Sequence, residues 1–273
     1  DGVTFLEAVE RLGGSVARIP ERAPVSFARC RPRHPSSSWG PDEWACLAAA
    51  IELYHNRLLS DSRALSYVEG RGLERETVER CQVGYAAGDE LVAYLRWRQI
   101  PTQAALRIGL LRRGGDESMA GRVVVPEVRG SRPVWLIGRT LAEDGAPKYL
   151  GLPGTRRLLG WDAAAREPTV YVVEGVFDWL TLRQWDVPAL ALLGTHIRPT
   201  MVEALRRFDR IFLALDGDAA GREATQRLLD DLGPKAIPVA LPGVKDVAEL
   251  AVRPDGAACF SRSVAAAELV PAA

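Results

Sequence analysis

Short apolar runs alternate with amphipathic stretches along the last hundred residues of the chain. The apolar runs lie at 170–173, 189–193, 210–215 and 236–241, and each is bounded by Gly, Pro or Asp. Continuous runs of this length are typical of strands that are buried on both faces. The segments between them, at 176–184, 199–207 and 219–232, and a short one from Val247, have the spacing of helices. The pattern therefore predicts an α/β domain with a four-stranded parallel sheet flanked by helices.

The preceding part of the chain shows a different pattern. Apolar residues recur at helical spacing between Phe5 and Leu12, and a stretch rich in Pro, Arg and Ser follows at 17–42. Helical spacing returns at 41–60, 62–69 and 74–81. Residues 122–149 instead contain short runs of strand-forming residues separated by turn residues. These patterns predict a helical N-terminal arm and then a mixed α+β subdomain.

We therefore expect four parts. They are a helix and linker arm at 1–40, a mixed α+β subdomain at 41–168, the α/β subdomain at 169–252 and a C-terminal tail at 253–273. No apolar run approaches the roughly 20 residues that a membrane helix needs, so we expect a soluble protein without a membrane partner. The chain opens at Asp1 without a recognisable leader, which favours a fragment of a longer protein.

The 35 basic and 35 acidic residues cancel, but they are unevenly distributed. The window 91–157 holds 12 basic and 5 acidic residues, whereas 169–273 holds 11 basic and 14 acidic residues. An excess of cations indicates either a solvated basic face or a surface that contacts phosphates. The four cysteines have no paired spacing, so the sequence shows no disulfide framework and no identifiable zinc site. A reducing, cytoplasmic setting fits this cysteine usage.

Acidic side chains follow three of the four predicted strands. They are Glu174 and Asp178 after the first strand, Asp216 and Asp218 after the third, and Asp246 after the fourth. Because the carboxyl ends of parallel strands meet at one edge of the sheet, we expect these carboxylates to lie close together. Each acid alone is typical of a turn, but crowded carboxylates repel one another unless a cation neutralises them. Oxygen ligands suit Mg²⁺ or Mn²⁺, and phosphoryl transfer is the chemistry that such a site most often serves.

The motifs around these acids resemble the Toprim domain that topoisomerases and bacterial primases share. They are Glu-Gly-Val-Phe-Asp at 174–178, Leu-Gly-Thr at 193–195, Asp-Gly-Asp-Ala-Ala-Gly-Arg at 216–222 and Leu-Pro-Gly-Val-Lys-Asp at 241–246. The Gly-Thr turn and the last segment narrow the resemblance to DnaG-type DNA primases. Motifs at 67–73, 81–85, 121–126, 137–139 and 146–150 resemble the helical entry and the basic subdomain of that family's catalytic core. The resemblance covers 60–251, and 4–12 is similar to the closing helix of the family's zinc-binding domain.

The resemblance implies a nucleotidyltransferase that synthesises short RNA primers on single-stranded DNA during DNA replication. Two divalent cations, Mg²⁺ or Mn²⁺, would align a nucleotide 3′-oxygen with the α-phosphate of the incoming nucleoside triphosphate. By position, Glu174, Asp216 and Asp218 would be catalytic, and these three with Asp178 and Asp246 would hold the metal ions. The residues expected to face the nucleotide or the template are Arg122, Arg139, Lys148, Tyr149, Arg156, Arg157 and Lys245.

Three places depart from the family pattern. Ala120 stands where the family usually has the first arginine of an Arg-x-Arg pair, and Ala248 replaces a second acid in the last motif. The stretch after 152–154 is short, and Arg156 and Arg157 take the place of a further lysine. These departures predict a smaller, altered binding groove. The sequence pattern resembles that of primases from mobile elements.

The sequence leaves two other functions open. A metal-dependent nuclease could use the same acids, although no tyrosine lies in an identifiable topoisomerase motif. A non-catalytic replication-accessory module that binds single-stranded DNA would account for the departures at Ala120 and Ala248. The primase interpretation implies single-stranded DNA, nucleoside triphosphates and a replicative helicase or single-stranded-DNA-binding protein as partners. Among the seven tryptophans only Trp97, which two arginines flank, is a candidate for stacking on a base.

Overall fold

The computed structural model describes residues 39–130, 132–142, 147–154 and 158–269. The predicted N-terminal arm therefore lies almost wholly outside the described residues. Two compact units make up the described part of the chain. Its residues within 39–66, 82–126 and 133–154 form the first unit, and those within 67–81, 127–132 and 158–269 form the second.

The second unit contains a parallel four-stranded sheet in the order β6-β5-β7-β8. Its strands are β5 (Thr169–Val173), β6 (Ala189–Ala191), β7 (Arg210–Leu213) and β8 (Ala236–Pro238). Its main helices are α8 (Val176–Gln184), α9 (Pro199–Leu205) and α10 (Ala219–Leu232), which connect successive strands. The predicted parallel α/β sheet is thereby confirmed.

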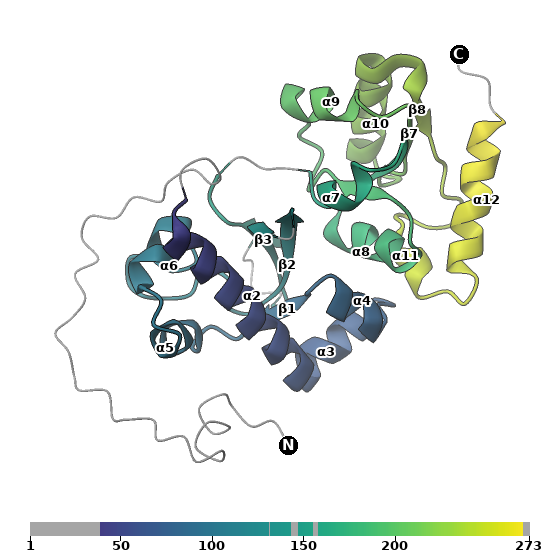
Figure 1. The fold of residues 1–273 in the computed structure, drawn as a ribbon. Helices are drawn as coiled ribbons and strands as arrows, with labels where there is room; N and C mark the ends of the chain where they lie inside the picture. The colour runs from purple at the N-terminus through teal and green to yellow at the C-terminus, as the bar shows by residue number, and fades with distance from the viewer. Residues whose placement is uncertain (1–38, 131, 143–146, 155–157, 270–273) are drawn as a thin grey trace. The chain divides into compact units, whose positions relative to one another are not determined.

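Alternate residues of β5 pack on opposite faces of this sheet, as the two-residue period of a strand requires. Val170 and Val172 belong to a core that the helices α9, α10 and the short α7 (Trp161–Ala164) supply. On the other face, Tyr171 stacks on Phe212 of β7 with ring centroids 4.9 Å apart, and Tyr171 also lies near Phe260 of α12 (Gly256–Glu268). Figure 1 shows α9 and α10 on one side of β7 and β8 and α12 on the other. Burial on both faces explains why the strand sequences are continuously apolar.

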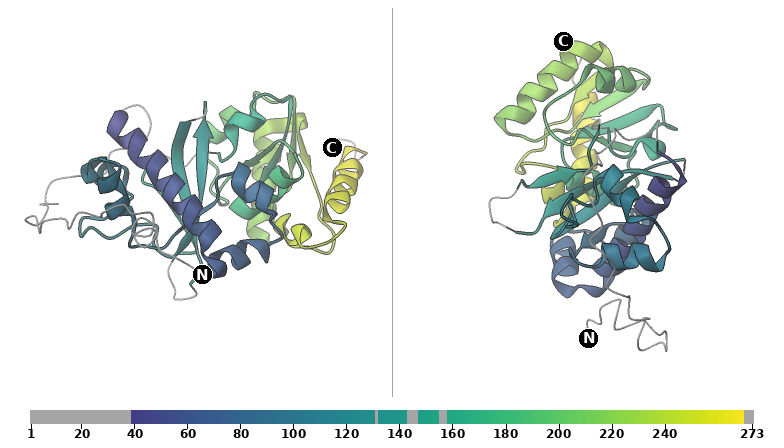
Figure 2. Two further views of the ribbon diagram at one scale, coloured as in Figure 1. Left: turned by 60° about the horizontal axis from the view of Figure 1, so that its bottom comes forward. Right: turned by 90° about the vertical axis from the view of Figure 1, so that its left-hand side faces the viewer.

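The first unit is built around a second sheet in the order β1-β2-β3-β4. The strands are β1 (Gly84–Ala86), β2 (Arg122–Arg129), β3 (Arg132–Thr140) and β4 (Tyr149–Gly151). The long helix α2 (Pro41–Ser60) packs against β1, and Figure 2 shows it in purple beside the teal strands. Gly84 permits this contact, because a Cβ there would lie 2.7 Å from the backbone carbon of Tyr54. Two shorter helices, α5 (Leu91–Trp97) and α6 (Thr102–Ile108), pack on α2.

The structure adds elements that the sequence patterns did not predict. These are α5, α6, α7, the three-residue strands β1 and β4, a short 3-10 helix at Gly233–Lys235, and α12 in the segment expected to be a tail. The predicted helices at 41–60, 62–69 and 74–81 correspond to α2, α3 (Ser62–Glu69) and α4 (Arg75–Arg80). None of the helices in the described part of the chain combines the length and the apolar character that a membrane span requires.

Candidate active site

The order of the strands brings the first two groups of acids to one place. The chain leaves β5 toward β6 on one side, and later strands add on the other side, beginning with β7. In such a sheet the loops after the two central strands diverge, and the gap between them is where ligands bind. Val172 of β5 pairs with Leu213 of β7, so Glu174 and Asp216 leave the sheet at the ends of adjacent strands.

The loop after β7 is held by the helix that it begins. Asp218 is the N-cap of α10, and its Oδ1 accepts a hydrogen bond from the Gly221 N–H at 3.0 Å. This bond lowers the pKa of Asp218, and Lys245 adds to the effect. Gly221 is required at its position because a Cβ there would overlap the carbonyl of Asp216. The first turn of α10 thus explains two spacings in the Asp-Gly-Asp-x-Ala-Gly motif. The N-cap Asp218 lies three residues before Gly221, and Gly221 lies against the Asp216 carbonyl.

Glu174 carries a buried oxygen that makes no hydrogen bond. Its Oε2 is one of four buried side-chain atoms without a hydrogen-bond partner in the described residues. Burial raises the pKa of Glu174 to about 7, and repulsion from Asp216 and Asp218 contributes to the rise. An acceptor left in this state is costly to stability unless a ligand satisfies it, which points to a functional site.

Asp178 lies beside this cluster, but its two oxygens are committed to the backbone. Oδ2 accepts from the Gly175 N–H at 3.0 Å and Oδ1 from the Ala248 N–H at 2.8 Å. The residue is 6% exposed. Burial raises its pKa to about 7, repulsion from Asp246 adds to the rise, and the two backbone hydrogen bonds oppose it. Asp178 therefore connects the loop after β5 to the start of α11 (Ala248–Ala251), and each of its oxygens keeps a second lone pair, so its predicted role as a metal ligand stays a prediction.

The fourth strand brings a cation and another acid to the same edge. The ammonium of Lys245 lies 3.6 Å from Asp216 Oδ2 and 3.3 Å from Asp218 Oδ2. Asp246 accepts a hydrogen bond from the Glu249 N–H at 2.9 Å. Part of its capacity to accept hydrogen bonds is therefore used at the start of α11. Burial and the charge of Asp246 raise the pKa of Asp216.

The chemistry of these donors fits a divalent cation. No three His, Cys, Asp or Glu side chains of the described residues are already arranged around a common ion position. However, Glu174 offers an unsatisfied oxygen, and repulsion among the neighbouring carboxylates adds to the effect of burial in raising the pKa values of Glu174 and Asp216. A cation at this edge would relieve that repulsion.

A group of cationic and aromatic side chains lies on the antiparallel strands of the first unit. The guanidinium of Arg139 donates to the Tyr149 hydroxyl at 2.7 Å and lies over the ring, 5.4 Å from its centroid. Lys148 Nζ lies 5.8 Å from the same centroid. Arg122 is 6% exposed, and its Nη1 donates to the backbone carbonyls of Pro147 and Lys148. We call Arg139, Lys148 and Tyr149 the basic cluster, with Arg122 supporting the strand that carries it.

Arg156 and Arg157, two of the other predicted contacts, are not among the described residues. Trp97 is 59% exposed at the end of α5 and packs on Tyr94 at a centroid distance of 5.7 Å.

Sequence reasoning missed two buried glutamates that organise the backbone. Glu117 accepts hydrogen bonds from the Tyr54 hydroxyl at 3.0 Å and from the Leu91 N–H at 2.8 Å. Glu127 is 1% exposed and accepts from the Gly160 N–H at 2.6 Å. Neither follows a strand end or a recognisable motif, so no pattern in the sequence singled them out.

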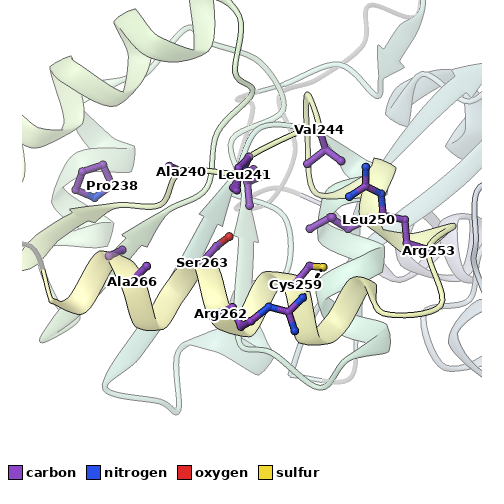
Figure 3. A pocket seen from close by; sticks show the side chains of 12 residues that line it. Pro238, Ala240, Leu241, Val244, Leu250, Arg253, Cys259, Arg262, Ser263 and Ala266 are labelled. Atoms are coloured by element: carbon purple, nitrogen blue, oxygen red, sulfur yellow. Dashed lines mark hydrogen bonds between the residues drawn. The ribbon is translucent and has the colours of Figure 1, made fainter.

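The second unit also contains a cavity of about 410 Å³ that is separate from the acids. Apolar side chains of α12 and of the segment around β8 line most of it, with Arg253 and Arg262 also among the lining residues (Figure 3). None of the five predicted metal ligands is among its lining residues.

Comparisons with known proteins match both units. A family model described as the N-terminal domain of the DNA primase catalytic core matches residues 53–157, and a Toprim-like model matches residues 171–251. The DNA primase of Clostridium acetobutylicum is 26% identical over 281 residues, which cover 96% of this chain and 46% of that protein. The chain spans less than half of the length of the curated relatives it matches.

Two solved structures show the same fold. A structure of the zinc-binding and RNA polymerase domains of Aquifex aeolicus primase superimposes with a TM-score of 0.74 at 26% identity, covering 82% of this chain and 60% of that one. A DnaG primase catalytic domain bound to single-stranded DNA has a TM-score of 0.69 at 26% identity, covering 82% of this chain and 78% of that one.

Proposed function

The chain belongs to the DnaG-type DNA primases, and from this premise we propose that it synthesises short RNA primers on single-stranded DNA by two-metal phosphoryl transfer. One observation carries the proposal: Glu174 and Asp216 leave adjacent central strands of a Toprim-like sheet at the same edge. The comparisons do not favour the nuclease or the non-catalytic alternative, because the matched relatives and structures are primases.

We assign the metal ions to Glu174, Asp216 and Asp218, with Asp246 beside them. Bound Mg²⁺ or Mn²⁺ would neutralise charge on the phosphates and favour in-line displacement. Asp218 reaches this edge as the N-cap of α10, and Asp216 through the turn that Gly221 permits. We assign Asp178 to positioning, since both of its oxygens accept backbone hydrogen bonds.

Glu174 is our candidate for the group that accepts a proton. Its buried Oε2 makes no hydrogen bond within the described residues, so it is open to a ligand. In the metal-free protein burial raises the pKa of Glu174 to about 7, and a bound divalent cation would lower that pKa and keep the carboxylate ionised, as a base requires. In this role the carboxylate would take the proton of the attacking 3′-hydroxyl.

We assign the template and the triphosphate to the cationic residues. The cationic side chains of Arg139 and Lys148 lie beside Tyr149, which suits contacts to phosphate oxygens and a base. Arg122 would support this cluster through its bonds to the backbone at Pro147 and Lys148. Arg156, Arg157 and Lys245 remain proposed contacts of the nucleotide or the template.

Single-stranded DNA and nucleoside triphosphates are the proposed substrates, with a replicative helicase or single-stranded-DNA-binding protein as a further partner. One of the matched structures is a primase catalytic domain with single-stranded DNA bound to it, which supports the proposed template. The cytoplasm is the location that we propose.

The test is incorporation of labelled nucleoside triphosphates on a mixed-sequence single-stranded DNA, with Mg²⁺ and then Mn²⁺. We expect short products from the wild-type protein and none from Asp216→Ala. Asp231→Asn, an exposed substitution near the end of α10, is the matched control and should leave synthesis unchanged. Cleavage of the labelled DNA without incorporation would favour the nuclease. DNA binding that persists in a chelator, without products under either metal, would favour the accessory module.

A further inference from the structure

The ammonium of Lys245 occupies the region where a metal ion would bind Asp216 and Asp218. It lies within 4 Å of an oxygen on each aspartate, at 3.6 and 3.3 Å. Among the ion pairs of the described residues, this is the cation that contacts both acids of the Asp-Gly-Asp motif. The side chain is 52% exposed, so its ammonium can also leave into solvent.

Two hydrogen bonds fix the backbone of Lys245 beside the aspartates. Its carbonyl oxygen accepts a hydrogen bond from the Gly217 N–H at 2.8 Å, which ties the loop after β8 to the loop between the two aspartates. Its own N–H donates to Glu249 Oε2 at 2.8 Å, at the start of α11. The ammonium therefore starts from a fixed backbone next to the acids, and only the side chain has to move when it leaves.

We propose that Lys245 is an internal counter-cation that competes with the divalent metal ion for Asp216 and Asp218. This inference rests on the metal-binding role proposed above for these two aspartates. In the metal-free protein the ammonium offsets the repulsion among the crowded carboxylates. A divalent ion on the same oxygens repels the ammonium, so binding of the metal displaces Lys245.

The identity of the side chain fits this role. Only three of the 35 basic residues in the chain are lysines, and one of them lies here. A guanidinium grips carboxylates through a planar fork of donors, whereas an ammonium is a point charge on a flexible stem. A lysine can thus neutralise two aspartates without holding either in a bidentate geometry.

Competition predicts opposite effects on two measured quantities when the charge is removed. Lys245→Met should raise the affinity for Mn²⁺ about three- to fivefold at low ionic strength, since the metal no longer displaces a cation. The same variant should have a lower Tm in chelator, because the acids lose their counter-ion. Saturating Mn²⁺ should remove most of that difference in Tm.

The experiment is a titration of the whole chain with Mn²⁺ alone, followed by calorimetry, beside thermal unfolding with chelator and with saturating Mn²⁺. Lys245→Arg keeps the charge and adds a bidentate fork of donors, so its affinity for Mn²⁺ should not exceed that of the wild type. Lys235→Met is the matched control, because Lys235 Nζ donates to the carbonyls of Arg206 and Phe208 rather than to carboxylates. Its affinity for Mn²⁺ should equal that of the wild type.

The outcomes separate this inference from the proposed function. If Asp216→Asn binds Mn²⁺ as tightly as the wild type, the metal site itself is wrongly assigned. If Asp216→Asn loses binding while Lys245→Met shows unchanged or weaker affinity, the competition is refuted and the metal site stands. A Tm of Lys245→Met that is lowered equally with and without Mn²⁺ would show a purely structural lysine. Raised affinity that fades at high salt supports the counter-cation.

Discussion

Oδ1 of Asp178 accepts a hydrogen bond from the backbone N–H of Ala248, which lies 70 residues further along the chain, at 2.8 Å. The other oxygen accepts from the Gly175 N–H, next to Glu174. A single buried side chain therefore connects the loop that carries Glu174 to the segment that carries Asp246. We propose that its contribution to function is to fix the distance between these two loops.

Asp178→Asn should lower the free energy of unfolding by about 1–3 kcal/mol. An amide has one oxygen, so its NH₂ group would face one of the two N–H donors without room for water. Urea unfolding followed by circular dichroism measures the loss. Asp209→Asn, at an exposed position before β7, should change the free energy by no more than about 0.5 kcal/mol.

If Asp178 positions the metal ligands without touching the ion, its replacement should still weaken metal binding. At a temperature where Asp178→Asn is folded, its affinity for Mn²⁺ should fall, but less than that of Asp216→Asn. Equal losses in the two variants would contradict the positioning role and favour direct ligation by Asp178.

The raised pKa of Glu174 predicts how pH affects the metal-free protein. In the folded state the carboxyl holds its proton up to about pH 7, whereas in the unfolded chain it loses the proton near its ordinary pKa of 4.5. Its contribution to stability is therefore complete below pH 4.5 and is lost as the pH rises through 7. Glu174→Gln removes this titration, so in chelator the variant should gain stability relative to the wild type between about pH 5 and 8.

Metal ions should reverse this comparison. Saturating Mg²⁺ at about pH 8 is expected to stabilise the wild type more than Glu174→Gln, because an ionised carboxylate binds the ion more tightly than an amide. Unfolding free energies at several pH values, with and without Mg²⁺, provide the measurement. A difference between the two proteins that does not depend on pH would show that Glu174 does not titrate in this range.

The fold of the second unit could be predicted from the sequence because its strands are buried on both faces. Continuous apolar runs bounded by Gly, Pro or Asp located β5, β6, β7 and β8. The same reasoning failed for β1 and β4, since a strand of three residues has too few positions to show a period. It also failed for α12, whose Ala-rich sequence resembles a tail until Phe260 is seen packing against Tyr171.

The candidate site was predictable only in part. Positions after strand ends identified Glu174, Asp216 and Asp218, whose roles remain predictions. The bonds of Asp178 and the ion pairs of Lys245 depend on which loops meet in space, and no local pattern encodes that meeting. Arg122 illustrates the same limit: its motif indicates a phosphate contact, which stays a prediction, whereas its bonds to the backbone carbonyls of Pro147 and Lys148 could not be predicted from the motif.

The basic cluster should contribute to binding of single-stranded DNA through charge. Lys148→Ala should weaken binding and reduce the slope of log K against log salt by about 0.7, the value for one phosphate contact on a single strand. Fluorescence anisotropy with a labelled oligonucleotide at several salt concentrations measures both effects. Lys235→Ala removes one charge from the second unit and should leave the slope unchanged, whereas an unchanged slope for Lys148→Ala would remove Lys148 from the interface.

Gly221 links the backbone of α10 to the position of Asp216. A Cβ at this position would overlap the carbonyl of Asp216, and its next nearest atoms are the carbonyl carbon and the Cα of the same residue. These are backbone atoms, so Gly221→Ala must displace the aspartate itself rather than a flexible side chain. Overpacking of this kind costs about 1–3 kcal/mol of stability.

Gly221→Ala should therefore bind Mn²⁺ more weakly than the wild type even under conditions where it is fully folded. Gly114→Ala is the matched control, because a Cβ there meets only Asp116 Oδ2 at 3.4 Å, an ordinary contact. Calorimetric titration with Mn²⁺ and urea unfolding should show both losses for Gly221→Ala and neither for Gly114→Ala. A folded Gly221→Ala with wild-type affinity would mean that the ion does not depend on where the backbone places Asp216, and the assignment of that residue as a ligand would have to be withdrawn.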